Sequence, residues 1–198
     1  APDDLHPEVF SGIRLLHVTG ITPALSPTCA ATVERAIELA HAAGAVVSFD
    51  PNYRPTLWNP VKARSVLLPL IQKADILLIG HEDSQAIFGV DDEESIVRAT
   101  VELGCKLVVL KRGDQGACAW DGKIRVSIPA EHVEEAIDPV GAGDAFGAGF
   151  LAGWLHGSTL EEALSLGIRA GAATVMTAGD YISQEQFSQM FTPIRRLL

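Results

Sequence analysis

The sequence has little cysteine, few aromatic residues and no long apolar run. Its three cysteines, Cys29, Cys105 and Cys118, lie far apart and form no CxxC pair, so we expect neither a disulfide framework nor a zinc site. No segment approaches the ~20 consecutive apolar residues of a membrane-spanning helix. The first residues also lack the basic start and apolar run of a signal peptide. These absences favour a cytoplasmic protein without a membrane partner.

Basic residues are also scarce. Fifteen Lys and Arg stand against 25 Asp and Glu, which gives the 198-residue chain a formal net charge of −10. A nucleic-acid-binding surface needs a concentrated basic face to neutralise phosphates, so we expect no nucleic-acid partner. The hydrophobic fraction of 47% is too high for a disordered chain. The length suits a single domain, residues 1–198, built around one core.

Four short and nearly continuous apolar runs recur in the first part of the chain, ending about 30 residues apart, as strand–helix–strand units do. The predicted strands are 13–19, 45–50, 75–79 and 106–111. Amphipathic patterns predict helices between them at 28–43, 61–73 and 93–103. Continuous apolar strands are typical of sheets covered on both faces. The predicted fold class is therefore α/β: a doubly wound, mainly parallel sheet with helices on both faces.

The second part of the chain breaks this rhythm. Segments 115–120 and 123–127 flank Asp121-Gly122, a pair typical of a two-residue type I′ turn, and so predict a β-hairpin. Further helices are predicted at 142–156, 159–177 and around 184–190. The second of these is rich in alanine and glycine, which would let a neighbouring backbone or a flat ligand approach closely.

The most informative segment is Asp138-Pro-Val-Gly-Ala-Gly-Asp144. Small residues at 141–143 allow backbone N–H groups to converge, and the following helix directs its positive dipole end at the same hollow, which predicts an anion site. A glycine-rich turn that only starts a packed helix is the alternative. Asp144 favours the site. Its carboxylate would repel the pyrophosphate of a dinucleotide, whereas phosphoryl transfer to a hydroxyl needs a base beside the phosphate.

This segment resembles the C-terminal signature D-T-x-G-A-G-D of the PfkB, or ribokinase-like, carbohydrate kinases, with Pro139 in place of the usual Thr. The resemblance implies that ATP is the phosphoryl donor and that Asp144 is the catalytic base, in contact with the substrate hydroxyl. It also implies that Asp138 helps to organise Mg²⁺ or the phosphates. The amides that would form the anion hole are those of Gly141, Ala142 and Gly143.

A second segment, Asp50-Pro-Asn-Tyr-Arg-Pro-Thr-Leu-Trp58, follows the second predicted strand. This places it at the sheet edge where α/β enzymes bind ligands. It is similar to the same position in 2-keto-3-deoxygluconate kinases, which implies that Asn52 and Arg54 contact a sugar acid and the phosphates. An arginine can hold two anionic oxygens at once. A proline-rich turn with a salt-bridged Arg54 is the alternative.

A third segment, 111–117, is similar to the K-x-G-x-x-G-A turn of the family. The resemblance implies ATP contacts for Lys111, Gly113 and Gly116. A plain turn between a strand and a hairpin would explain the same residues equally well.

The segment 80–84 follows the third predicted strand, where the family usually has N-x-x-E. On the simplest alignment Ser84 stands where that Glu would be, and Glu82 becomes the candidate ligand for magnesium, which prefers carboxylates. A helix-capping role for Glu82 and Asp83 is an equally good interpretation.

The resemblance spans nearly all of this chain but only the later part of the family, whose members carry further N-terminal strands and a small lid. It implies a ribokinase-like domain without those parts, and an ATP- and Mg²⁺-dependent kinase of a sugar or sugar acid, most like 2-keto-3-deoxygluconate. One alternative is a catalytically idle nucleotide-binding fragment, and another is a dinucleotide-dependent oxidoreductase, which Asp144 disfavours. The uncovered edge of the first strand would also allow pairing with another copy of the chain.

Overall fold

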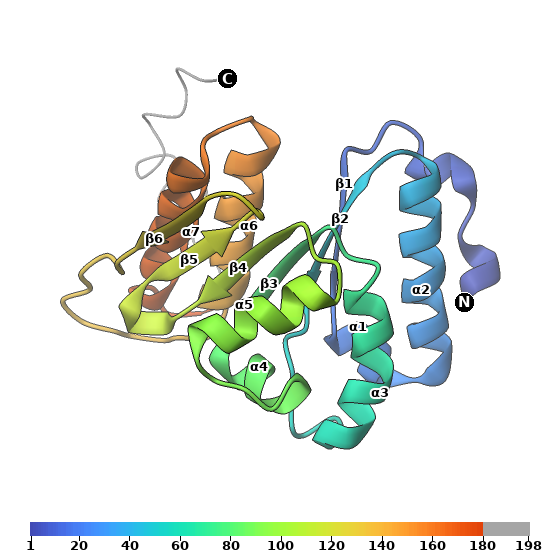
Figure 1. Ribbon diagram of the computed structural model, residues 1–198, viewed down its shortest axis with the longest axis horizontal. Helices are drawn as coiled ribbons and strands as arrows, with labels where there is room; N and C mark the ends of the chain where they lie inside the picture. The colour runs from blue at the N-terminus through green and yellow to red at the C-terminus, as the bar shows by residue number, and fades with distance from the viewer. Residues whose placement is uncertain (180–198) are drawn as a thin grey trace. The chain divides into compact units, whose positions relative to one another are not determined.

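The computed structural model describes residues 1–179, and the predicted helix around 184–190 lies outside these residues. The chain divides into two compact units. Figure 1 labels the helices and strands of both. The first consists of Ala1–Leu110 and Trp120–Arg125, and the second of Lys111–Ala119 and the residues from Val126 onward. The two units are described separately below. The expectation of a single domain therefore stays a prediction.

Within residues 1–179, six strands form one mixed, mostly parallel sheet whose order follows the chain. The strands are β1 (Leu15–Thr19), β2 (Val46–Asp50), β3 (Ile76–Gly80), β4 (Leu107–Lys111), β5 (Ala117–Trp120) and β6 (Arg125–Ile128). β1 pairs with β2, and β2 with β3, in parallel. Consecutive residues of β2, β3 and β4 are buried, so both faces of these strands are covered. The predicted fold class is confirmed.

The first unit carries the connecting helices. They are α1 (Ile21–Leu25), α2 (Pro27–Ala42), α3 (Pro60–Ile71), α4 (His81–Ile87) and α5 (Glu93–Glu102), with short 3₁₀ turns at Pro2–Asp4 and Pro7–Phe10. Ser26, Asn59 and Asp92 start α2, α3 and α5 as N-caps, each accepting a backbone N–H in its side chain. The three predicted helices are thus confirmed. The short helix α1 was not predicted from the sequence, and α4 was predicted only as the alternative in which Glu82 and Asp83 cap a helix.

Close backbone packing brings together the chain segments that leave β1 and β2. The Gly20 N–H donates to the Asp50 carbonyl at 2.8 Å. A Cβ on Gly20 would lie 2.0 Å from the carbonyl oxygen of Pro51, so a larger residue would displace the start of the loop that follows β2. This loop holds the predicted substrate residues, and glycine at position 20 is therefore part of how the sequence positions them.

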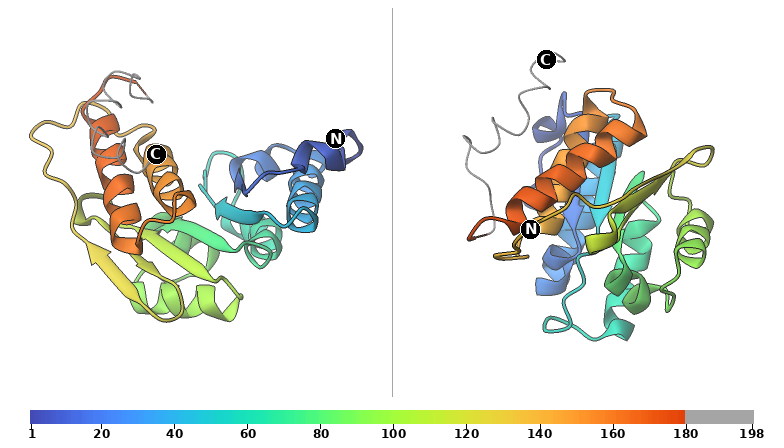
Figure 2. Two further views of the ribbon diagram at one scale, coloured as in Figure 1. Left: turned by 90° about the horizontal axis from the view of Figure 1, so that it is seen from above. Right: turned by 90° about the vertical axis from the view of Figure 1, so that its left-hand side faces the viewer.

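The second unit contains two helices of similar length, α6 (Ala142–Leu155) and α7 (Leu160–Val175). They lie side by side (Figure 2). Their small residues serve this contact. A Cβ on Gly149 would lie 2.7 Å from the Leu166 carbonyl oxygen, and one on Gly167 would lie 2.9 Å from the Phe146 carbonyl oxygen. The glycine- and alanine-rich pattern of α7 therefore allows close approach of a neighbouring helix.

The predicted hairpin is present and is formed by β5 and β6. The prediction of a two-residue type I′ turn at Asp121-Gly122 is wrong. That turn needs positive φ at both central residues, and of the pair only Gly122 has it, at 89°. Instead, residues 121–124 form a longer loop. The Asp121 carboxylate accepts the N–H groups of Lys123 and Ile124 at 2.9 and 2.7 Å. One backbone bond still crosses the turn, from the Asp121 N–H to the Ile124 carbonyl at 3.3 Å. The Ile124 N–H bonds to the aspartate side chain instead of to a backbone carbonyl.

No helix within the described residues is both long enough and apolar enough to cross a membrane.

Candidate active site

The loop after β2 starts at a buried carboxylate. Asp50 is 2% exposed, and its Oδ1 accepts the Asn52 N–H at 3.1 Å. Asn52 itself has a φ of 41°, the one positive value among the non-glycine residues that the structure describes. Asparagine tolerates this left-handed conformation better than most residues because its short polar side chain can bond locally. The loop therefore turns sharply at the residue predicted to contact substrate.

Arg54 follows two residues later and is exposed. Its carbonyl accepts the Leu57 N–H at 3.0 Å, which closes a turn, while its guanidinium has no hydrogen bond or ion pair within residues 1–179. The alternative of a salt-bridged Arg54 is therefore not what the described residues form. An exposed guanidinium with five N–H donors is suited to an anionic oxygen pair.

Asp83 ties this loop to the start of α4. The carboxylate is buried, with 9% exposure. Its Oδ1 accepts the Tyr53 N–H at 2.8 Å, and its Oδ2 accepts the Gly80 N–H at 3.0 Å. The bond to Gly80 is the helix cap that the sequence suggested. The bond from the Tyr53 N–H was not predicted, because nothing in the sequence shows which loop contacts Asp83.

The neighbouring predicted positions have different surroundings. Ser84 is buried, and its Oγ donates to the Gly80 carbonyl at 2.8 Å, so its hydroxyl is used within α4. Glu82 is exposed on the same helix. Its role as a magnesium ligand stays a prediction.

In the second unit, the glycine-rich segment forms a turn into α6. Gly141 is the N-cap of this helix and has a φ of 79°, a left-handed conformation that disfavours any residue with a Cβ. The Ala142 N–H donates to the Pro139 carbonyl at 3.3 Å, and the Val140 N–H donates to Asp138 Oδ1 at 2.9 Å. The turn is therefore held by its own backbone and by Asp138. The first amides of a helix lack intrahelical acceptors, so this end of α6 is suited to an anion.

Asp144 is the third residue of α6 and is exposed, as is Gly143. The ammonium Nζ of Lys111 lies 3.9 Å from the position that a Cβ on Gly143 would take. Lys111 is the last residue of β4. The structure therefore brings together a carboxylate, a helix N-terminus and an ammonium group, all of which were singled out from the sequence.

The two other glycines predicted to contact ATP differ from each other. Gly113 has a φ of 58° and is exposed, with no atom within 4 Å of where its Cβ would lie. Gly116 is buried, and its Cβ would lie 2.1 Å from the Ile128 carbonyl oxygen. Packing against the hairpin thus explains glycine at position 116 without a ligand.

The described residues contain no group of three or more His, Cys, Asp or Glu side chains that could hold a metal ion. This does not conflict with magnesium chemistry, because Mg²⁺ in phosphoryl-transfer sites is held by one or two carboxylates together with phosphates and water. Glu82 and Asp138 remain single carboxylates in separate units.

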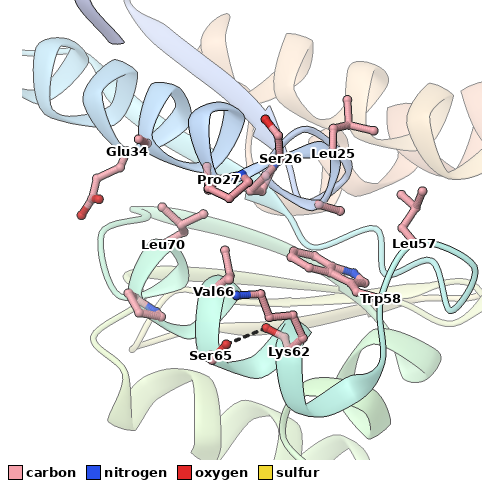
Figure 3. A pocket seen from close by; sticks show the side chains of 15 residues that line it. Leu25, Ser26, Pro27, Glu34, Leu57, Trp58, Lys62, Ser65, Val66 and Leu70 are labelled. Atoms are coloured by element: carbon pink, nitrogen blue, oxygen red, sulfur yellow. Dashed lines mark hydrogen bonds between the residues drawn. The ribbon is translucent and has the colours of Figure 1, made fainter. Parts of the chain in front are cut away.

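A cavity of about 590 Å³ lies in the first unit between α1, the start of α2 and α3 (Figure 3). Its lining is mainly apolar and includes Leu25, Leu57, Trp58, Val66 and Leu70. None of the predicted site residues lines it. It is therefore separate from the candidate site, although Leu57 and Trp58 belong to the same loop as Arg54.

Another aspartate, Asp75, forms an ionic cluster immediately before β3. Burial opposes ionisation of Asp75, but hydrogen bonds from Lys106, the Val47 N–H and His41 outweigh it and hold the pKa of this carboxyl below its usual value. Burial, reinforced by the nearby Asp75 charge, raises the pKa of the Cys105 thiol to about 11. A buried thiol with so high a pKa is a poor nucleophile at neutral pH.

Known proteins are similar to this chain along most of its length. The pattern of the pfkB family of carbohydrate kinases matches residues 5–186. A 2-dehydro-3-deoxygalactonokinase from Haloferax volcanii is 32% identical over 90% of this chain, and a 2-dehydro-3-deoxygluconokinase from Thermoproteus tenax is 36% identical over 90%. The chain spans 57% and 54% of the lengths of these two relatives, respectively.

Among solved structures, an Escherichia coli protein assigned as a ribokinase II, in complex with ATP and Mg²⁺, is similar with a TM-score of 0.85 and 26% identity. The match covers 99% of this chain and 63% of that protein. The family pattern covers residues 5–186, which is most of the chain, and this chain therefore belongs to the pfkB family of carbohydrate kinases.

Proposed function

We propose that the protein transfers the γ-phosphoryl group of ATP to a hydroxyl of a sugar acid similar to 2-keto-3-deoxygluconate (also called 2-dehydro-3-deoxygluconate). One observation carries the proposal: Asp144 is exposed at the N-terminal turn of α6, where Lys111 Nζ lies 3.9 Å from the Cβ position of Gly143. A base beside a cationic, amide-lined end of a helix is what phosphoryl transfer to an alcohol needs.

In the proposed reaction, the Asp144 carboxylate takes the proton of the acceptor hydroxyl. The hydroxyl oxygen then forms a bond to the γ-phosphorus as the bond to the leaving oxygen of ADP breaks. The amides of Gly141, Ala142 and Gly143 and the ammonium of Lys111 stabilise the negative charge on the transferring group. Of these amides, Ala142 would have to exchange its 3.3 Å bond to Pro139 for one to phosphate.

The residues present fit ATP and magnesium. Gly143 is exposed and has no side chain, so phosphate oxygens can reach the backbone of the first turn of α6. Asp138 uses Oδ1 to bond Val140 and has a second carboxylate oxygen for a hydrated cation. Glu82 is the other proposed magnesium residue, and the exposed Gly113 is the other proposed ATP contact. The buried Gly116 would act only by letting this turn pack against the hairpin. When bound, ATP supplies the phosphoryl group, and Mg²⁺ neutralises part of its charge.

The acidic class of substrate is proposed from the loop after β2. Arg54 is exposed and makes no ion pair within the described residues, and Asn52 precedes it on a fixed turn. A bidentate arginine distinguishes a carboxylate from a neutral hydroxyl group. The names of the two relatives, a 2-dehydro-3-deoxygalactonokinase and a 2-dehydro-3-deoxygluconokinase, support the same class. We also propose that the enzyme works in the cytoplasm, where ATP is available.

The test is a substrate panel on the full-length natural protein with ATP and Mg²⁺. We expect phosphorylation of 2-keto-3-deoxygluconate or 2-keto-3-deoxygalactonate, with ribose, fructose and ribonucleosides at least about tenfold poorer in kcat/KM, which corresponds to about 1.4 kcal/mol. ADP release and mass spectrometry of the product measure this. A neutral sugar that is preferred to both acids would contradict the acidic class while leaving the kinase reaction intact.

A second candidate is a nucleotide-binding chain without turnover of its own. The chain spans 54–57% of the lengths of the two relatives, so residues 1–198 are tested separately from the full-length natural protein. ATP titration together with the panel, on residues 1–198 alone, separates the two candidates. Binding of ATP without phosphorylation of any sugar would support the second, and efficient phosphorylation would exclude it.

A further inference from the structure

The loop that carries Asn52 and Arg54 is held at its middle by one buried carboxylate. Tyr53 lies between these two residues, and its N–H donates to Asp83 Oδ1 at 2.8 Å. We propose that Asp83 is a positioning residue, which holds the backbone of the loop so that Arg54 is directed at the carboxylate of an acidic sugar. This inference rests on the proposed function.

The bonding of Asp83 requires a carboxylate rather than a neutral side chain of the same shape. Its two oxygens accept N–H groups from two different segments, Tyr53 in the loop and Gly80 at the start of α4. An asparagine has one acceptor oxygen, and its NH₂ group would face the second N–H donor. Because Asp83 is only 9% exposed, water has little access to replace the hydrogen bond that the variant loses.

The loop needs such a restraint. Asn52 is in a left-handed conformation, which is uncommon even for asparagine and is stabilised here by bonds to its neighbours. Two further bonds act on the same loop: Asp50 Oδ1 accepts the Asn52 N–H at 3.1 Å, and the Tyr53 hydroxyl donates to the Trp58 carbonyl at 3.1 Å. Arg54 is thus an exposed side chain on a fixed backbone. Such pre-organisation reduces the conformational entropy that is lost when a ligand binds.

The direct test is Asp83→Asn in the full-length natural protein. We expect KM for 2-keto-3-deoxygluconate to rise roughly tenfold, while kcat and KM for ATP stay within about twofold, because the bond to the loop affects acid binding rather than transfer. Amide hydrogen exchange at Tyr53 should become faster. Asp92→Asn is the matched control: Asp92 also accepts a backbone N–H at a helix start, from Ser95 at 2.9 Å, but does not contact the loop.

Two further variants separate positioning from a general loss of stability. In an Arg54→Ala background, Asp83→Asn should change acid affinity by less than about twofold, because its effect acts through the arginine. Tyr53→Phe removes the hydroxyl bond to Trp58 but keeps the amide bond to Asp83. It should raise KM for the acid by a smaller factor, and it keeps the inference testable if Asp83→Asn does not fold.

The outcomes are distinct. An unchanged KM for the acid in both Asp83→Asn and Tyr53→Phe overturns the inference, as does an equal rise in the Arg54→Ala background or in the Asp92→Asn control. A wild-type protein that phosphorylates only neutral sugars overturns the acidic substrate class instead. A tenfold rise that is confined to the acid and lost with Arg54 supports the inference.

Discussion

Two aspartates occupy the same position in two helices but differ in almost everything else. Asp83 is the third residue of α4, after the N-cap Gly80, and Asp144 is the third residue of α6, after the N-cap Gly141. Asp83 is buried and accepts two backbone N–H groups, whereas Asp144 is exposed. The same residue at the same helical position therefore holds the backbone in one unit and is accessible in the other.

The N-cap glycines explain part of this difference. Gly80 has an extended conformation with a φ of −106°, so its N–H points back to the carboxylate three residues later. Gly141 has a left-handed conformation with a φ of 79°. At α4, both carboxylate oxygens of Asp83 therefore accept backbone N–H groups. A carboxylate whose oxygens are both hydrogen-bonded in this way is a poor candidate for a general base.

The largest difference is expected in stability when each aspartate is truncated. Asp83→Ala should lower the free energy of unfolding by about 1–3 kcal/mol, because two N–H donors lose a buried acceptor. Asp144→Ala should lower it by less than about 1 kcal/mol, since solvent screens the interactions of an exposed carboxylate. Urea unfolding of both variants measures this. Equal losses would mean that the two carboxylates do not differ in structural role.

The two N-cap glycines sharpen the comparison. Gly141→Ala should lower the free energy of unfolding by about 1–2 kcal/mol, because a residue with a Cβ is disfavoured in the left-handed region. Gly80→Ala should cost less, since its φ is negative and the nearest atom to an added Cβ is Asp83 Oδ2 at 3.4 Å. Thermal unfolding of the two variants tests the ranking, and a reversed order would contradict the assignment of the left-handed cap to α6.

The smallest effect is expected at Asp75, a second carboxylate held by several donors. Asp75→Asn should lower the free energy of unfolding by up to about 1 kcal/mol near pH 7. The effect is small because Lys106 is exposed and solvent screens its ion pair with Asp75. The pKa of Asp75 is lowered in the folded protein. Its contribution is therefore present above the ordinary aspartate pKa and is lost as pH falls through the lower folded value. Unfolding measured from pH 7 to pH 3 should show the two proteins converging, and a constant difference would contradict this.

Much of the fold could be predicted because its signals are local. Apolar runs about 30 residues apart gave the four strands, and amphipathic patterns gave α2, α3 and α5 within a few residues. Helix α1 was missed because five residues are too few to display a helical period, and the seven residues of α4 were signalled only by the capping residues Glu82 and Asp83. The turn at Asp121 was mispredicted because its side chain competes for backbone donors, which a dipeptide pattern does not show.

The site could be predicted in part for the same reason. The glycine segment and Lys111 come together within the second unit, and each was recognisable as a motif. The bond from Tyr53 to Asp83 joins residues 30 positions apart, and no short pattern contains both. The roles of Asp144, Asn52 and Arg54 stay predictions.

The most direct test of the central claim is turnover by Asp144→Asn, measured beside ATP affinity in the same preparation. Loss of a general base should reduce kcat by about 10²–10⁴-fold. The dissociation constant for ATP should change little, because an amide at this position removes the proton acceptor while the helix N-terminus and Lys111 remain. If Asp144→Asn instead phosphorylates the sugar acid at the wild-type rate, the proton is taken elsewhere and Asp144 is not the base.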